Sequence, residues 1–340
     1  MVETDVHFPT DINLLYDAVR KSVELTARLC ADYGVPGWRQ SNYLLEKLRR
    51  QLHFCEKRKH STSKKPEKQA RKEEEMKAAH SDYLTASIRL MDRVTDSAAA
   101  VLCQAAGNAM VTATVAAIDR FAADARHQLD LATRRVLKGE TIPHDEKLFS
   151  IFEKHTEWIS KGKAGVAQEL GLRVGIVEDR HGFILAHEVM EKIGDIQVAE
   201  SLLTEAKKRF PDLVSCSFDQ GFWSPENQEK LQAIIPMPAL RKRGRLSQAD
   251  RERRESEEFR QAEQRHSAVE SCINALGNHG LDRCPDCGID GFKRYVALAV
   301  TARNIQILGA ELQRRERVRK KRVRRIKAGL PAKRHLAQVA

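Results

Sequence analysis

Apolar residues at helical spacing predict the elements of the first third of the chain. The first helix is predicted by the apolar residues Leu14, Leu15, Ala18, Val19 and Leu25. Thr10 or Asp11 precedes the run and is a suitable cap. Residues 41–76 are highly charged, and residues 60–66 at their centre predict a turn or linker between two exposed helices. Two further helices are expected over residues 83–104 and 110–137, so residues 35–140 form an all-helical layer without a catalytic signature.

The pattern changes at Ile142-Pro143. Residues 172–177 and 183–189 are rich in β-branched and apolar residues, and the polar, Gly-containing stretch between them predicts a hairpin. A helix over residues 196–208, a buried strand over residues 213–218 and a helix starting at Ser224-Pro225 follow. This order of strands and helices predicts a mixed α/β fold.

Composition describes a soluble globular chain of 340 residues, 41% of them apolar and 31% charged. No run of apolar residues is long enough for a membrane span, and the acidic N-terminus does not resemble a signal peptide. The seven cysteines are an odd number and mostly isolated, which indicates reduced thiols in a cytoplasmic protein.

The formal net charge of +12 is concentrated at the C-terminus. Residues 311–340 hold twelve Lys/Arg and two Glu, whereas the preceding residues hold 47 basic and 45 acidic side chains. A near-neutral body with a basic tail indicates a polyanionic partner, and nucleic acid is the simplest one. The expected phosphate contacts in the tail include Arg319, Lys320, Lys321 and Arg322.

Two acids are candidates for chemistry. Asp219 ends the strand of residues 213–218 and is followed by Gly221, where an open α/β sheet receives ligands. A simple turn cap explains Asp219 equally well. Glu270 stands in a half-apolar helical stretch and requires a cation, a metal or a hydrogen-bond donor, although a surface pair with Arg265 is the simpler explanation. Together Asp219 and Glu270 are suited to bind Mg²⁺.

Three further segments are candidates for ligand binding. Cys284 and Cys287 with His279 give three zinc ligands at most, so a turn with two thiols is favoured. Lys161 and Lys163 lie in a basic, glycine-containing loop that suits a nucleic-acid backbone or solvent equally. The basic loop after residue 240 is a second candidate for DNA contacts, through Arg241, Lys242, Arg243 and Arg245.

Six segments in order resemble bacterial insertion-sequence transposases of the ISNCY type. They are VETDVHFPTD near the N-terminus, residues 146–159 with the Lys-Gly-Lys loop, the hairpin of residues 178–190, SFDQGFWSPEN from Ser217, HSAVESCIN from His266, and GLDRC with GFKRYVALAV from Gly280. The resemblance runs from Met1 to about Gly309, and the shared order makes it far more specific than any single motif.

The resemblance implies a DDE transposase whose RNase H-like core is interrupted by a helical insertion. In such enzymes three carboxylates hold two Mg²⁺ (or Mn²⁺) ions that activate water and then a 3′-hydroxyl for attack on DNA. Asp219 matches the second acid and Glu270 the third, His266 would orient DNA or water, and Arg283 would contact phosphate. The implied partners are double-stranded element ends, target DNA and further copies of the chain, with no membrane, in the nucleoid of a bacterial cytoplasm.

The resemblance also divides the chain. Residues 1–34 match the first core segment, residues 35–140 the insertion, residues 141–310 the catalytic core, and residues 311–340 are a basic tail. The family's first catalytic Asp falls upstream of Met1, and Glu3 and Asp5 do not match its motif. We therefore expect a shortened transposase with impaired strand transfer. The alternatives are a non-catalytic DNA-binding remnant and, more distantly, a zinc-dependent regulator.

Overall fold

The computed structural model describes residues 1–58, 65–160, 168–242 and 244–328, without the side chains of Arg265, Ser267, Ala268 and Glu270. The chain forms two compact units. The helical unit comprises Val6–Thr156, and the α/β unit comprises Met1–Asp5 together with the chain from Glu157 onwards.

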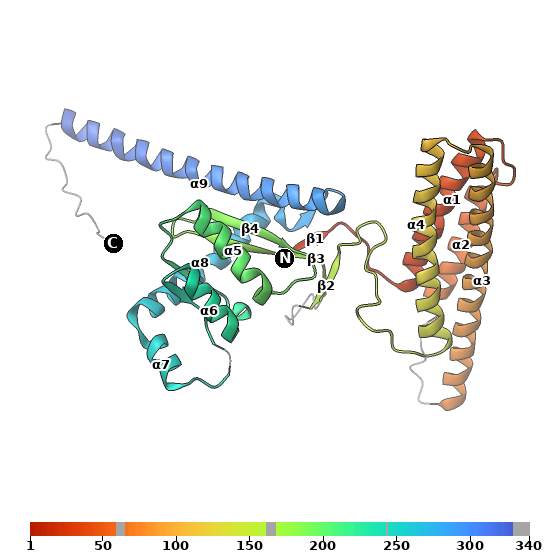
Figure 1. Cartoon of the computed structure of the whole chain (residues 1–340), viewed down its shortest axis with the longest axis horizontal. Coiled ribbons are helices and arrows are strands. Elements are labelled where there is room, and N and C mark those ends of the chain that lie inside the picture. Colours follow the sequence, from red (N-terminus) through yellow and green to blue (C-terminus); the bar gives the residue numbers. More distant parts are fainter. Residues whose placement is uncertain (59–64, 161–167, 243, 329–340) are drawn as a thin grey trace. The chain divides into compact units, whose positions relative to one another are not determined.

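The helical unit is a bundle of four long helices that lie side by side (Figure 1). They are α1 (Asp11–Asp32), α2 (Ser41–Glu56), α3 (Pro66–Gln104) and α4 (Ala109–Ala132), which ends in the π-turn η1 (Thr133–Leu137). The expected cap is Thr10, whose hydroxyl oxygen accepts the Asn13 N–H at 3.2 Å. The bundle also includes α1, which the sequence had grouped with the core segment of residues 1–34.

Packing explains why α1 belongs to the bundle. Its apolar face, which includes the fully buried Leu15 and Val19, lies in one core cluster with residues of α2, α3 and α4. Tyr83 of α3 is fully buried, and its hydroxyl donates to the Ile12 carbonyl at 2.9 Å. The indole N–H of Trp38 donates to the hydroxyl of Ser97 in α3 at 2.9 Å. Apolar burial therefore draws α1 into the bundle although β1 precedes it directly.

The α/β unit is built on a mixed five-stranded sheet. Its strands are β1 (Val2–Thr4), β2 (Glu157–Ser160), β3 (Gln168–Glu178), β4 (Ile184–Met190) and β7 (Arg283–Cys284). β1 lies between β3, which it pairs antiparallel, and β7, which it pairs parallel. β3 and β4 form the predicted hairpin, with Gly182 at positive φ in its turn. The expected mixed α/β class is confirmed.

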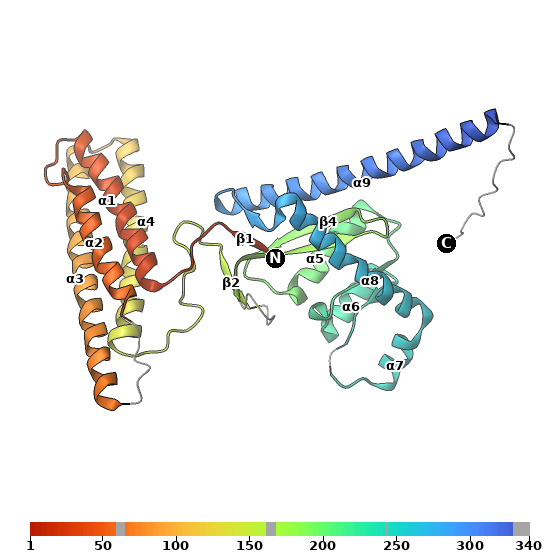
Figure 2. The same ribbon diagram turned by 180° about the vertical axis from the view of Figure 1, so that it is seen from behind.

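Helices cover both faces of this sheet, and the alternation along β3 shows why. Leu172 belongs to the core cluster that includes β1, α8 (Glu257–Leu276) and α9 (Gly288–Lys327), whereas Val177 belongs to the cluster with α5 (Asp195–Arg209). Neighbouring strand residues point to opposite faces, so one strand serves both layers. Figures 1 and 2 show α5 and α8 on opposite sides of the sheet.

A second, two-stranded sheet joins β5 (Ser215–Ser217) and β6 (Met237–Ala239) in parallel. The turn η2 (Gln220–Phe222) and α6 (Pro225–Ile234) connect them, and Ser224 caps α6 as expected. The predicted strand over residues 213–218 is present, but it is shorter than expected and it is not buried. Only residues 215–217 are extended, and Val214 is 59% exposed, because β5 has a strand neighbour on one side only.

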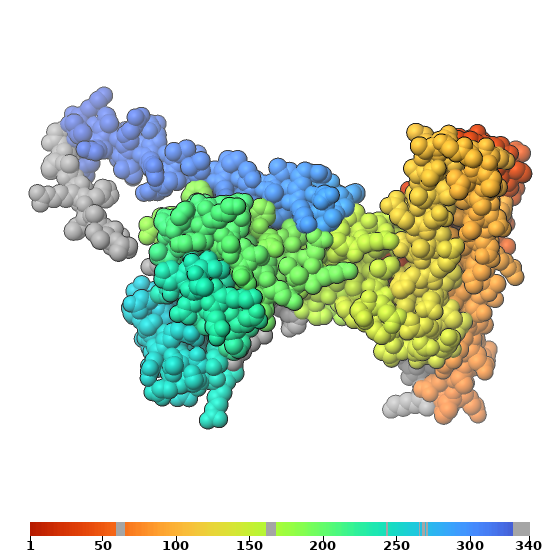
Figure 3. All heavy atoms as spheres, viewed as in Figure 1, coloured from red at the N-terminus to blue at the C-terminus, as the bar shows by residue number. Residues whose placement is uncertain are grey.

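The C-terminal part is helical. It contains α7 (Gln248–Glu255), α8, the π-turn η3 (Gly277–Leu281) and the 40-residue α9. α9 packs on the sheet with its first turns and continues beyond it (Figure 3). Among the described residues no helix combines the length and the apolar character that crossing a bilayer requires.

All seven cysteines are free. Burial raises the pKa of Cys55 to about 11 and that of Cys216 to about 12. Cys103 and Cys287 are exposed. Because the thiolate is the reactive form, we expect a thiol reagent at neutral pH to modify these two rapidly and the other five only after unfolding. Mass spectrometry of peptides after brief alkylation tests this, and rapid labelling of Cys55 in folded protein would contradict the burial of the bundle core.

Candidate functional site

Asp219 follows β5 and begins a tight turn. Its Oδ1 accepts the Gln220 N–H at 2.6 Å, so the carboxylate caps η2. The side chain is exposed, which leaves it accessible to a ligand. The structure therefore gives Asp219 the capping role that the sequence left open, and it keeps the carboxylate at the surface.

Helix α8 is tied to the same strand end. Ser217, two residues before Asp219, lies 3.1 Å from His266 of α8 (Ser217 Oγ to His266 Nδ1). Ser217 and His266 are 49 residues apart in sequence. This hydrogen bond brings together two segments that the sequence marked separately, and it gives His266 a contact with the strand that leads to Asp219.

Glu270 stands one helical turn after His266 on α8. Residues four apart share a helix face, so its backbone position is on the side of α8 that meets β5. Its side chain lies outside the described residues. The expected pairing of Asp219 with Glu270 therefore stays a prediction, and the structure shows only that α8 contacts β5 through His266 and Ser217.

One acid beside the Asp219 turn was not foreseen. A methyl group on Gly221 would stand 2.6 Å from Asp195 Oδ2, so the first residue of α5 lies directly against η2. Arg173 of β3 is the ionic partner of Asp195, at 3.6 Å. Sequence reasoning missed Asp195, because its proximity to η2 comes from the packing of α5 on the sheet.

The basic loop after residue 240 is held by acids of its own unit. Arg241 Nε lies 2.8 Å from Glu263, and this hydrogen bond, with a smaller contribution from the charge of Asp219, raises the Arg241 pKa. Lys242 lies 2.5 Å from Asp250 and lowers the pKa of that carboxyl. These two cations are thus already ion-paired, whereas Arg245 is exposed. Arg243 falls outside the described residues, as do Lys161 and Lys163.

Arg283 of β7 pairs with two acids, Glu3 within β1 and Asp5 just after it. Its guanidinium lies 3.5 Å from Glu3 and 3.4 Å from Asp5, at an exposed position. Glu3 and Asp5 therefore pair with Arg283, the expected phosphate contact.

The Cys284-to-Cys287 segment is a turn at the start of α9. Cys284 is buried, Cys287 is the exposed N-cap residue of α9, and His279 Nε2 contacts Gln306 Oε1 at 2.8 Å. No cluster of three or more His, Cys, Asp or Glu side chains suited to a metal exists in the described part of the chain.

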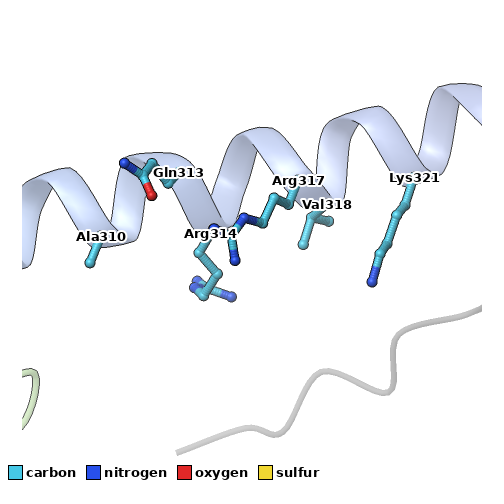
Figure 4. A pocket seen from close by; sticks show the side chains of 6 residues that line it. All are labelled: Ala310, Gln313, Arg314, Arg317, Val318 and Lys321. Atoms are coloured by element: carbon cyan, nitrogen blue, oxygen red, sulfur yellow. The ribbon is translucent and has the colours of Figure 1, made fainter.

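The far half of α9 carries a cationic surface. A shallow hollow along it is lined by Ala310, Gln313, Arg314, Arg317, Val318 and Lys321, and Figure 4 shows Arg314 and Lys321 projecting on one side. Arg314 pairs with Glu311 at 2.6 Å, and Arg319 and Lys320 pair with Glu316. Arg317, Lys321 and Arg322 have no ionic partner among the described residues and remain available to phosphates.

Comparison with known proteins adds no relative: no family model, no curated protein and no solved structure matches the chain.

Proposed function

We propose that this chain is a DDE-type DNA transposase of an insertion sequence. The observation that carries the proposal is the Ser217–His266 hydrogen bond, because it joins the strand end of Asp219 to the helix of Glu270. Two acids separated by 51 positions thus belong to segments that meet in space. Metal-dependent phosphodiester chemistry requires such carboxylates at one place.

A mixed sheet covered by helices supports the proposal of an RNase H-like core, although β5, which leads to Asp219, pairs with β6 in a second sheet. A central β1 pairs antiparallel with the hairpin strand β3 and parallel with β7, and helices cover both faces. The helical unit separates β1 from β2 along the chain, as an insertion does. We assign the same core to this protein.

The proposed donors for one Mg²⁺ ion are Asp219 and Glu270. Magnesium is commonly bound by one or two carboxylates together with waters and substrate phosphates. Asp219 uses one oxygen to cap η2 and is exposed, so its second oxygen is available, and Glu270 is the second carboxylate. A bound Mg²⁺ or Mn²⁺ ion would polarise the scissile phosphate and activate the attacking oxygen. His266 contacts Ser217 at 3.1 Å and would help to hold α8 against β5.

A non-catalytic DNA-binding protein is the second candidate. The feature that favours it is the capping bond of Asp219, since a capping acid needs no metal. Both candidates use α9 to bind DNA in the bacterial nucleoid, so DNA binding supports both and metal-dependent cleavage separates them.

Binding to DNA is expected to depend on the cations of α9 that have no ionic partner. Each phosphate contact contributes about 0.9 to the slope of log affinity against log salt. Replacing Arg317 and Lys321 with Gln should therefore lower the slope by roughly 2 and weaken binding to any duplex.

Fluorescence anisotropy with a short duplex at several salt concentrations measures this slope. The matched control is Lys47→Gln with Lys68→Gln, which removes the same charge from exposed positions of α2 and α3. Equal slopes for wild type and the α9 variant would refute α9 as the DNA-binding element.

The direct test of the proposed function is strand cleavage. Full-length protein is incubated with supercoiled plasmid carrying the element ends, with Mg²⁺, with Mn²⁺ or with EDTA. Metal-dependent nicking supports the transposase. Tight, salt-dependent DNA binding without any nicking in either metal selects the non-catalytic alternative.

A further inference from the structure

Helix α9 has two different sides. Phe292, Val296 and Val300 are buried against the sheet, and Asn304 both donates to and accepts from the backbone of Ile184 at 2.9 Å. Residues on the other side of the helix face away from the rest of the α/β unit (Figures 1 and 3).

This outer side carries an apolar stripe. It consists of four residues with large solvent-exposed fractions: Leu298 (62%), Ile305 (64%), Leu308 (49%) and Leu312 (55%). Leu298, Ile305 and Leu312 are seven residues apart, and Leu308 adds the intermediate position. At about 100° per residue these positions lie roughly opposite Val296 and Val300. An aliphatic stripe with a seven-residue repeat is the surface that two supercoiled helices bury between them.

The residues flanking the stripe leave room for a second helix. Ala297, Ala302 and Gly309 border it, and small side chains let two helix backbones approach closely. No other described helix has exposed aliphatic residues repeating at this spacing, because the exposed apolar residues of α2, α3 and α4 are isolated. The stripe is thus complementary to itself, which is the requirement for a two-fold symmetric contact.

We infer that α9 pairs with α9 of a second copy of this chain, antiparallel and centred between Ile305 and Leu308. In this register Ile305 meets Leu308 of the other copy, Thr301 meets Leu312, and Leu298 meets the aliphatic part of Arg315. The resemblance implies further copies of the chain as partners, and the inference adds the contact surface and the orientation, which hold whether or not the protein cleaves DNA.

Charge selects the antiparallel orientation. Residues 313–327 contain ten Lys/Arg and one Glu, so parallel pairing would place twenty cations side by side. Antiparallel pairing places each cationic end beside the first turns of the other α9. There Lys293 is paired with Glu191 at 2.6 Å and Arg294 with Asp286 at 2.5 Å, so that stretch is already neutralised. The two cationic segments then point in opposite directions. The face of each that carries Arg314, Arg317 and Lys321 is not part of the helix contact and stays accessible to DNA.

Sedimentation velocity tests the association. Wild-type protein should shift from monomer to dimer over roughly a hundredfold range of concentration. Ile305→Glu with Leu308→Glu should weaken dimerisation at least tenfold, because it places like charges in the seam. The matched control is Val318→Glu, an exposed aliphatic residue on the opposite side of α9. Circular dichroism verifies that all variants are folded. A wild-type monomer at every concentration, or equal dimerisation of the stripe variant and wild type, would overturn the inference.

Cross-linking tests the orientation. In a background with Cys103 and Cys287 replaced by Ser, Thr301→Cys and Leu312→Cys are prepared as separate proteins. Oxidation of the mixture should yield the cross-linked dimer, whereas neither protein alone should. Self-cross-linking of Leu312→Cys would refute the proposed register.

Discussion

Replacing Gly171 with Ala is expected to lower the free energy of unfolding of the α/β unit by about 3 kcal/mol. A methyl group at Gly171 would overlap the Val2 carbonyl oxygen and stand 2.8 Å from Glu3 Cα and 2.9 Å from the Val2 carbonyl carbon. All three are backbone atoms of β1, and they cannot move without breaking the pairing of β1 with β3. The substitution therefore separates the central strand from the sheet.

Gly175→Ala is the matched control because it lies on the same strand. The nearest atom to its added methyl group is Leu202 Cδ2 at 3.0 Å, the end of a flexible side chain. We expect Gly175→Ala to change the free energy of unfolding by no more than about 1 kcal/mol, because the Leu202 side chain can rotate away and Ala suits a strand better than Gly. Differential scanning calorimetry should show that the midpoint temperature of unfolding of the α/β unit decreases by about 8 °C in Gly171→Ala only. Equal decreases of the unfolding temperature in both variants would contradict the close pairing of β1 with Gly171.

Asp219→Asn and Glu270→Gln are each expected to reduce metal-dependent DNA cleavage at least about a hundredfold. Asparagine keeps an oxygen that can accept the Gln220 N–H, so the η2 cap and the fold are retained while the charge is lost. An amide is a poor ligand for a hard divalent cation, so the loss should appear in metal affinity as well as in rate.

Two readouts separate the proposed role from a structural one. Titration of Mn²⁺ by electron paramagnetic resonance reports metal binding without DNA, and plasmid nicking reports cleavage. Asp212→Asn is the control, an exposed acid seven residues before Asp219 on the same segment. Full cleavage by both variants would exclude Asp219 and Glu270 as the catalytic acids. DNA binding that is unchanged in both, with no metal binding in wild type, would identify the non-catalytic protein.

The sequence alone determined those features that depend on local chemistry. The cap at Thr10, the hairpin of β3 and β4, and the start of α6 at Ser224 follow from a few neighbouring residues, and each is present. Helical spacing likewise predicted the bundle helices, because burial of one apolar face imposes that period. The concentration of cations near the C-terminus was visible without any structure, since charge is a property of composition.

Tertiary structure decided which segments meet. Apolar packing placed α1 in the bundle, and the pairing of β1 with β3 and β7 depends on contacts between residues some 170 and 280 positions apart. The same holds for the Ser217–His266 contact, for Asp195 against Gly221 and for the ion pairs of Arg241 and Lys242. No local pattern encodes these proximities, because a side chain's partners across the fold depend on how every intervening element packs. The outer stripe of α9 became recognisable as a surface only once the sheet had been shown to cover the opposite side.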